Sequence, residues 1–181
     1  MNQNSFINRI SLSTLLIVAF IFVHTDFLYA ENQNAYGLPK QLKLFKAPGF
    51  SLKGEDGKTY RLSDFRGKLV IINFWATWCP PCRYEMPAME RAWKKLKGKG
   101  VMLLAINVGE DENTLFEFMA KYPMSFPVLM DRKGEVIKQY KVTGLPTTYI
   151  IDQKGVVIHR AMGGRLWDHP KLVKKLLNLA K

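Results

Sequence analysis

Residues 78–82 read Trp-Cys-Pro-Pro-Cys and contain the only two cysteines of the 181-residue chain. They directly follow residues 68–75 (KLVIINFW), a continuous apolar run with β-branched residues, which predicts a strand buried on both faces. After Cys82, apolar residues recur at spacings of three and four up to about residue 97, which predicts an amphipathic helix. The two cysteines are therefore expected where a buried strand passes into a helix.

This position favours redox chemistry. A helix N-terminus carries unpaired N–H groups and about half a unit of positive charge, which would stabilise a Cys79 thiolate placed just before it. A lowered thiol pKa makes Cys79 the attacking sulfur, and Cys82, one turn into the helix, suits the resolving role. Pro80 and Pro81 stiffen the loop and remove two possible N–H donors, so we expect only a moderate lowering of the Cys79 pKa.

Two other uses of the cysteines fit less well. A structural disulfide between residues three apart would stabilise little, because the benefit grows with the loop that it closes. A structural zinc site needs four ligands, and the chain adds only His24, His159 and His169, which are not at zinc-finger spacing. We therefore expect no metal at this pair.

The N-terminus is typical of an export signal. Arg9 precedes the apolar run of residues 10–23, which is shorter than the roughly 20 residues that span a membrane. We predict a signal peptide over residues 1–30, cleaved after Ala30, and the alternative is a retained membrane anchor over residues 10–30. Either leader places the folded part in the periplasm or another extracytoplasmic space of a bacterium, where disulfides are favoured. The net charge of +12 is interpreted as solvated lysine faces, and no nucleic-acid motif accompanies it.

The remaining chain alternates between strand and helix patterns. Residues 31–46 are polar and are interpreted as a linker, and residues 50–62 predict a β-hairpin turning at Asp56-Gly57. Further elements are expected as strands over 101–108, 126–131, 147–151 and 156–161, and as helices over 111–122, 134–142 and a final segment capped by Asp168. This order implies one α/β domain over residues 47–181, with a central mixed sheet flanked by helices.

Taken together, these residues resemble the thioredoxin superfamily, and within it the exported TlpA/ResA-type thiol-disulfide oxidoreductases of the AhpC/TSA-Redoxin-like group, which include cytochrome c maturation thioredoxins. The resemblance runs from about Ala47 to the C-terminus. It rests on three stretches in the expected order, NFWATWCPPCRYEMP (73–87), GLPTTYIID (144–152) and FSLKGEDGKTYRLSDFRGK (50–68). It implies a thioredoxin-like fold with an N-terminal β-hairpin and an extra central helix.

The resemblance also implies roles for particular residues. Cys79 would be the nucleophile, Cys82 the resolving cysteine, and the two would form a disulfide without a soluble cofactor. Pro146 would be the cis-proline that packs against this disulfide and exposes the backbone of Leu145 to a substrate strand. Apart from the resemblance, we expect Trp78, Pro80 and Pro81 to line the substrate groove, and the alternative role of Trp78 is packing alone.

One position departs from ordinary thioredoxins, which place a buried Asp six residues before the first cysteine. Asn73 occupies that position here and cannot titrate. In cytochrome-maturation relatives, a Glu three residues after the second cysteine is an active-site acid, and Glu85 matches it. We expect Glu85 to tune the proton of Cys82, against the simpler interpretation of a surface helix residue that complements the helix dipole.

The expected activity is the reduction of disulfides in exported proteins, with apocytochrome c as the substrate that the resemblance favours. The expected reductant is a membrane thiol-transfer protein. The alternatives are a copper chaperone of the SCO type, in which His159 would be the third ligand, and a peroxidase of the peroxiredoxin type. The cysteine spacing argues against the copper chaperone, and the motif around Cys79 argues against the peroxidase.

Overall fold

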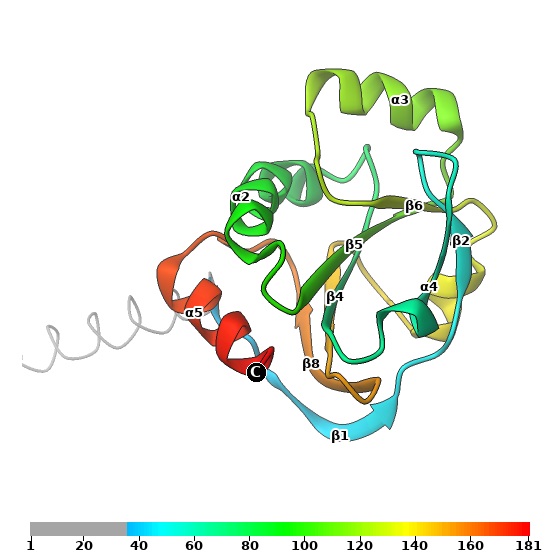
Figure 1. Ribbon diagram of the computed structural model, residues 1–181. Helices are drawn as coiled ribbons and strands as arrows, with labels where there is room; N and C mark the ends of the chain where they lie inside the picture. Colours follow the sequence, from blue (N-terminus) through cyan, green and yellow to red (C-terminus); the bar gives the residue numbers. More distant parts are fainter. Residues whose placement is uncertain (1–35) are drawn as a thin grey trace, which may run out of the picture. The chain divides into compact units, whose positions relative to one another are not determined.

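The computed structural model describes residues 36–181, so the predictions for the leader and for residues 31–35 lie outside the described residues. Within 36–181, no helix is long and apolar enough to cross a membrane. The central element is a six-stranded sheet in the order β1-β8-β7-β4-β5-β6 (Figure 1). Its strands are β1 (Lys40–Lys46), β4 (Leu69–Trp75), β5 (Val101–Val108), β6 (Val128–Asp131), β7 (Thr147–Ile151) and β8 (Val156–Met162).

The sheet is mixed, as predicted. β4, β5 and β6 run parallel to one another, whereas β7 is antiparallel to both β4 and β8, and β1 is antiparallel to β8. The predicted hairpin is confirmed as a separate two-stranded sheet of β2 (Ser51–Lys53) and β3 (Thr59–Arg61). A short 3-10 helix, η1 (Leu62–Phe65), links it to β4.

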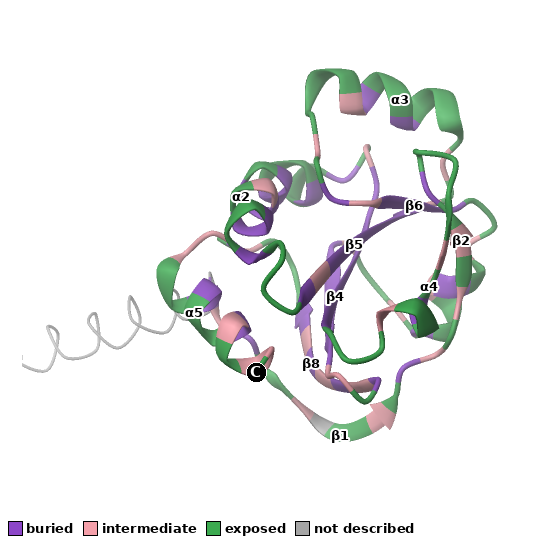
Figure 2. Ribbon diagram, in the orientation of Figure 1, coloured by how far each residue is buried: buried purple, intermediate pink, exposed green. Residues whose placement is uncertain are grey.

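Helices and the hairpin cover both faces of the sheet. One hydrophobic cluster joins one face to α2 (Pro80–Leu96), α3 (Glu112–Lys121) and α5 (Pro170–Leu179), and the other joins the opposite face to α4 (Glu135–Gln139) and the hairpin (Figure 1). Strands β4 and β5 are almost wholly buried between these layers (Figure 2). The continuous apolar runs in the sequence therefore mark the centre of the fold.

The alternation of side chains along β4 decides where Asn73 lies. Leu69, Ile71 and Trp75 belong to the cluster beneath α2, while Val70, Ile72 and Phe74 belong to the opposite cluster. Asn73 has the same parity as the first group and pairs in register with Thr148 of β7. A polar side chain is thereby carried into the interface between the sheet and α2.

Two predictions at the ends of the domain are wrong. Residues 40–46 are not a linker, because they form β1 and pair with β8, so the ordered domain begins before residue 47. The polar sequence of β1 suits an edge strand, whose lysines discourage pairing with further strands. The final helix is capped by His169, whose ring accepts from the backbone N–H of Lys171, while Asp168 instead pairs with Arg91.

Candidate active site

Cys79 and Cys82 are joined by a disulfide at the start of α2, with their Cα atoms 5.3 Å apart. Cys79 is the N-cap residue of the helix, and its sulfur accepts from the backbone N–H of Cys82 at 3.4 Å. Pro80 and Pro81 occupy the first two helical positions, where a missing N–H breaks no helical hydrogen bond. Cys82 is completely buried and Cys79 is 3% exposed, so the predicted strand-to-helix junction and the disulfide are both present.

Glu85 lies one turn beyond Cys82 on α2, and it is 3% exposed. Its Oε1 accepts from the Asn73 side chain at 2.8 Å. Its Oε2 accepts from the indole N–H of Trp167 at 2.9 Å and from the backbone N–H of Arg165 at 3.1 Å. The interpretation of Glu85 as a surface helix residue is therefore wrong, because the carboxyl is enclosed by β4, α2 and the segment before α5.

This environment gives Glu85 an unusual acidity. Burial removes water from the carboxylate and raises the pKa of Glu85 from 4.5 to about 7, although the hydrogen bonds from Trp167, Asn73 and Arg165 oppose the rise by stabilising the charged form. A carboxyl with a pKa near neutrality can both give and take a proton at physiological pH. Asn73 does not titrate, and its amide also donates to the Thr148 hydroxyl at 2.9 Å, which fixes its orientation.

The Leu145–Pro146 peptide bond is cis, as the resemblance implied. The carbonyl of Pro146 accepts from the backbone N–H of Gly163 at 2.9 Å. The next residue, Gly164, lies so close to the cysteine turn that an added Cβ would be 3.2 Å from the Pro81 carbonyl oxygen. The Gly163-Gly164 backbone therefore links the cis-proline to the turn that holds the disulfide.

The expected groove residues differ in their exposure. Trp78 is 68% exposed, and Pro80 and Pro81 are also exposed, whereas Leu145 is half-buried. Met162, opposite Thr147 on the β7–β8 pair, adds a further exposed apolar side chain near Pro146. Exposed apolar side chains near a buried reactive group favour contact with another polypeptide.

Sequence reasoning missed three contributors to the site. Trp167 and Arg165 reach Glu85 from a segment about 80 positions away, and no local pattern indicates that contact. Glu110, which follows β5, accepts from the backbone N–H and the hydroxyl of Thr77 and from the Asn107 side chain. It thereby fixes the turn between β4 and Trp78.

Within the part of the chain that the structure describes, His159 is the histidine considered as a third copper ligand. His159 is buried on β8, and its Nδ1 donates to the Pro39 carbonyl at 3.0 Å, since a carbonyl can only accept. Burial lowers the pKa of His159. Within residues 36–181, no group of three His, Cys, Asp or Glu side chains is arranged to hold a metal ion, so His159 does not complete the copper set with the two cysteines.

Several known proteins are similar to this chain in sequence. Residues 45–160 match the AhpC/TSA family. The thiol-disulfide oxidoreductase ResA of Bacillus subtilis is 40% identical over 132 residues, which cover 71% of this chain and 74% of that protein. ResA of Geobacillus kaustophilus is 37% identical over 156 residues, covering 86% of each chain.

The solved structures agree. A thiol:disulfide interchange protein of the thioredoxin family from Chlorobium tepidum is 33% identical, with a TM-score of 0.66 over 76% of this chain and 99% of that one. StoA from Bacillus subtilis has a TM-score of 0.62 at 23% identity, a likeness of fold alone. The chain therefore belongs to the AhpC/TSA family, and its paired cysteines make it a thiol-disulfide oxidoreductase with a thioredoxin-like fold, of the TlpA/ResA type.

Proposed function

We propose that the protein reduces disulfides in exported proteins, and that Cys79 is the nucleophile. The observation that carries this proposal is the position of the disulfide at the α2 N-terminus, next to a buried carboxyl with a pKa near 7. A thiolate at Cys79 is stabilised there by the helix dipole and by the Cys82 N–H, which already points at its sulfur. Cys82, which is wholly buried, is the resolving thiol.

The reaction has two exchange steps. The Cys79 thiolate attacks one sulfur of the substrate disulfide, which forms a mixed disulfide and releases the other substrate sulfur as a thiolate that takes up a proton. The Cys82 thiol then loses its proton and attacks the Cys79 sulfur. This step breaks the mixed disulfide, releases the second substrate thiol and leaves the Cys79–Cys82 disulfide, so two electrons pass to the substrate.

Glu85 accepts the proton that Cys82 must lose in the second step. It is one helical turn from Cys82, it is shielded from solvent, and its pKa of about 7 allows it to take a proton without holding it permanently. Asn73 occupies the position of the thioredoxin aspartate and supports Glu85 through its amide. The group that handles the proton is therefore on α2 in this protein, whereas in ordinary thioredoxins it is on the strand that corresponds to β4.

Substrate binding involves the exposed apolar side chains near the disulfide. The backbone of Leu145, held before the cis-proline, pairs with an extended substrate segment, while Trp78, Pro80 and Pro81 contact its side chains. The proposed substrate is apocytochrome c, whose haem-attachment sequence Cys-x-x-Cys-His must be reduced before haem is joined. A membrane thiol-transfer protein would re-reduce the pair in the periplasm or an equivalent extracytoplasmic space.

The reduction potential tests the direction of electron flow. We expect a value near or below about −220 mV, as in reducing members of the fold, and a value near about −120 mV would identify a protein that makes disulfides instead. The Cys82→Ser variant should accumulate the mixed disulfide with an oxidised Cys-x-x-Cys-His peptide, while Cys79→Ser should form none. Rapid peroxide turnover by the reduced protein would favour the peroxidase alternative.

A further inference from the structure

The segment between β8 and α5 closes over Glu85. We call residues 163–167 the closing loop. Its Gly163 N–H donates to the Pro146 carbonyl, and its Arg165 N–H and Trp167 indole N–H both donate to Glu85 Oε2. The loop therefore contacts the cis-proline at one end and the buried carboxyl at the other.

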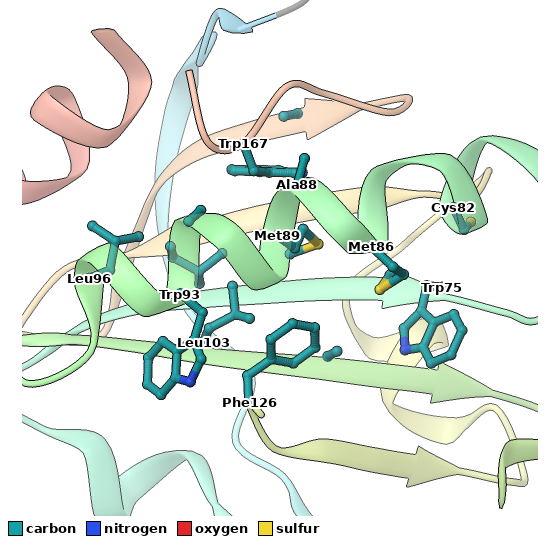
Figure 3. Packing of buried hydrophobic residues seen from close by; sticks show 14 of the residues in the cluster. Trp75, Cys82, Met86, Ala88, Met89, Trp93, Leu96, Leu103, Phe126 and Trp167 are labelled. Atoms are coloured by element: carbon teal, nitrogen blue, oxygen red, sulfur yellow. The ribbon is translucent and has the colours of Figure 1, made fainter. Parts of the chain in front are cut away.

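Trp167 is the more deeply placed of the two donors to Glu85. It is 1% exposed and lies over α2 near Ala88, in the hydrophobic cluster that contains Cys82 (Figure 3). An indole has one polar hydrogen and no acceptor, so this N–H can only donate, and Glu85 is its partner. A packed ring gives this donor a fixed direction, which an exposed side chain would lack.

Arg165 fixes the other part of the loop. Its guanidinium donates to the Gly37 carbonyl at 2.8 Å and to the carbonyls of Met162 and Gly163 at 3.0 and 3.2 Å. The segment 36–39 is held in turn, because Lys175 donates to the Leu38 carbonyl and His159 to the Pro39 carbonyl. The three successive carbonyls of residues 37–39 thus accept hydrogen bonds from the closing loop, from α5 and from β8, which connects all three to the start of the domain.

We propose that Trp167 and Arg165 are positioning residues for Glu85: Trp167 orients the carboxyl and favours its charged form through the indole N–H, and the Arg165 side chain holds the closing loop in the position that this contact needs. The inference rests on the proposed role of Glu85 in accepting the Cys82 proton. The closing loop would then take part in the exchange reaction. It contains no cysteine, and it lies far along the chain from the cysteine pair, just before the last helix, α5.

A small set of neighbouring groups affects the ionisation of Glu85. Within residues 36–181, the groups that most strongly stabilise its charged form are the Trp167 indole, the uncharged Asn73 from β4, and the backbone N–H and guanidinium of Arg165 from the closing loop. Thr148 of β7 reaches Glu85 only through Asn73, and on α2 the adjacent titratable side chains, Arg83 and Tyr84, are exposed. Loss of the Trp167 N–H should therefore change the ionisation of Glu85 directly.

The test replaces Trp167 by Phe in the full chain, which keeps an aromatic ring but removes the N–H. In the oxidised protein, Glu85 should titrate about one pH unit higher by carboxyl NMR, because a hydrogen bond to a charged group is lost. In the reduced protein, the pH profile of disulfide exchange should move upward by a similar interval. Trp75→Phe is the matched control, since Trp75 is equally buried and its indole N–H has no partner among the described residues.

Two further variants separate the possible outcomes. In a Glu85→Gln background, Trp167→Phe should move the exchange profile no further, and an equal movement there would mean that Trp167 does not act through Glu85. Arg165→Lys keeps the positive charge but loses the forked contacts, so a smaller upward movement of the Glu85 titration is expected. Arg165 is half-buried rather than buried, so this variant also tests the inference if Trp167→Phe does not fold.

The inference and the proposed function can fail separately. An unchanged Glu85 titration in both Trp167→Phe and Arg165→Lys would overturn the positioning roles, whatever the activity. A shifted titration with an unchanged exchange profile would support the positioning of Glu85 and would instead remove Glu85 from the proposed exchange reaction.

Discussion

Replacement of Glu85 by Gln should make the stability of the oxidised protein depend differently on pH. In the unfolded chain Glu85 loses its proton near 4.5, whereas in the folded protein burial holds the pKa at about 7. Between these values the unfolded state binds fewer protons than the folded state, so the free energy of unfolding falls as pH rises. The Gln variant has no such proton and should not show this loss.

The size of the effect follows from that interval. From 4.5 to about 7, at about 1.4 kcal/mol for each pH unit, the wild type should lose about 3 kcal/mol that the variant keeps. Gln will also introduce a fixed cost, because Asn73, Arg165 and Trp167 all donate and only one amide oxygen can accept. That cost is independent of pH, so only the change with pH is the prediction.

Urea unfolding of both proteins at pH 4.5, 5.5, 6.5 and 7.5 provides the measurement. The free energy of unfolding of the Gln variant, minus that of the wild type, should increase by about 3 kcal/mol across this range. Above this range it should stay level. His159 contributes with the opposite sign in both proteins and cancels in the difference. Glu117→Gln, on the exposed face of α3, controls for the lost charge. A difference that stays constant with pH would refute the argument that burial controls Glu85.

Three other predictions concern the scaffold. His159→Gln should make the protein less sensitive to acid. Burial lowers the pKa of His159 below 6.5, so the wild type loses stability as the pH falls below 6.5, and urea midpoints measured from pH 7 to 5 test this. Leu96→Ala should lower the free energy of unfolding by about 2–5 kcal/mol because Leu96 is wholly buried, whereas the exposed Leu44→Ala should change it by less than about 0.5 kcal/mol. Asp131→Ala should lower it by about 2 kcal/mol, because the buried carboxylate accepts the N–H groups of Glu135 and Ile137 at the start of α4, and Asp131→Asn should lose less because one acceptor remains.

The sequence alone was enough to predict the central strands, the redox pair and its place in the chain. The apolar runs of β4, β5 and β7 are continuous because these strands are covered on both faces, and burial of that kind leaves a direct mark on composition. The Cys79–Cys82 spacing and the helix pattern that follows are local features, set by neighbouring residues. Pro146 was predicted to be cis by resemblance, and its peptide bond is cis.

The edge of the sheet and the last helix cap depended on longer-range contacts. β1 is polar and has no strong strand pattern, and it becomes a strand because its backbone groups pair with β8, more than a hundred residues later. His169 rather than Asp168 caps α5, because Asp168 is drawn into an ion pair with Arg91 of α2. Neither partner can be read from the neighbouring sequence.

The family resemblance of the sequence pointed to Glu85, but only the tertiary structure decided its chemistry. On an isolated helix its carboxyl would face water and titrate near 4.5. The fold encloses it between Asn73 of β4 and Trp167 of the closing loop, residues 12 and 82 positions away in the chain. A pKa depends on the water and charges around a group, and these are set by which distant segments pack there.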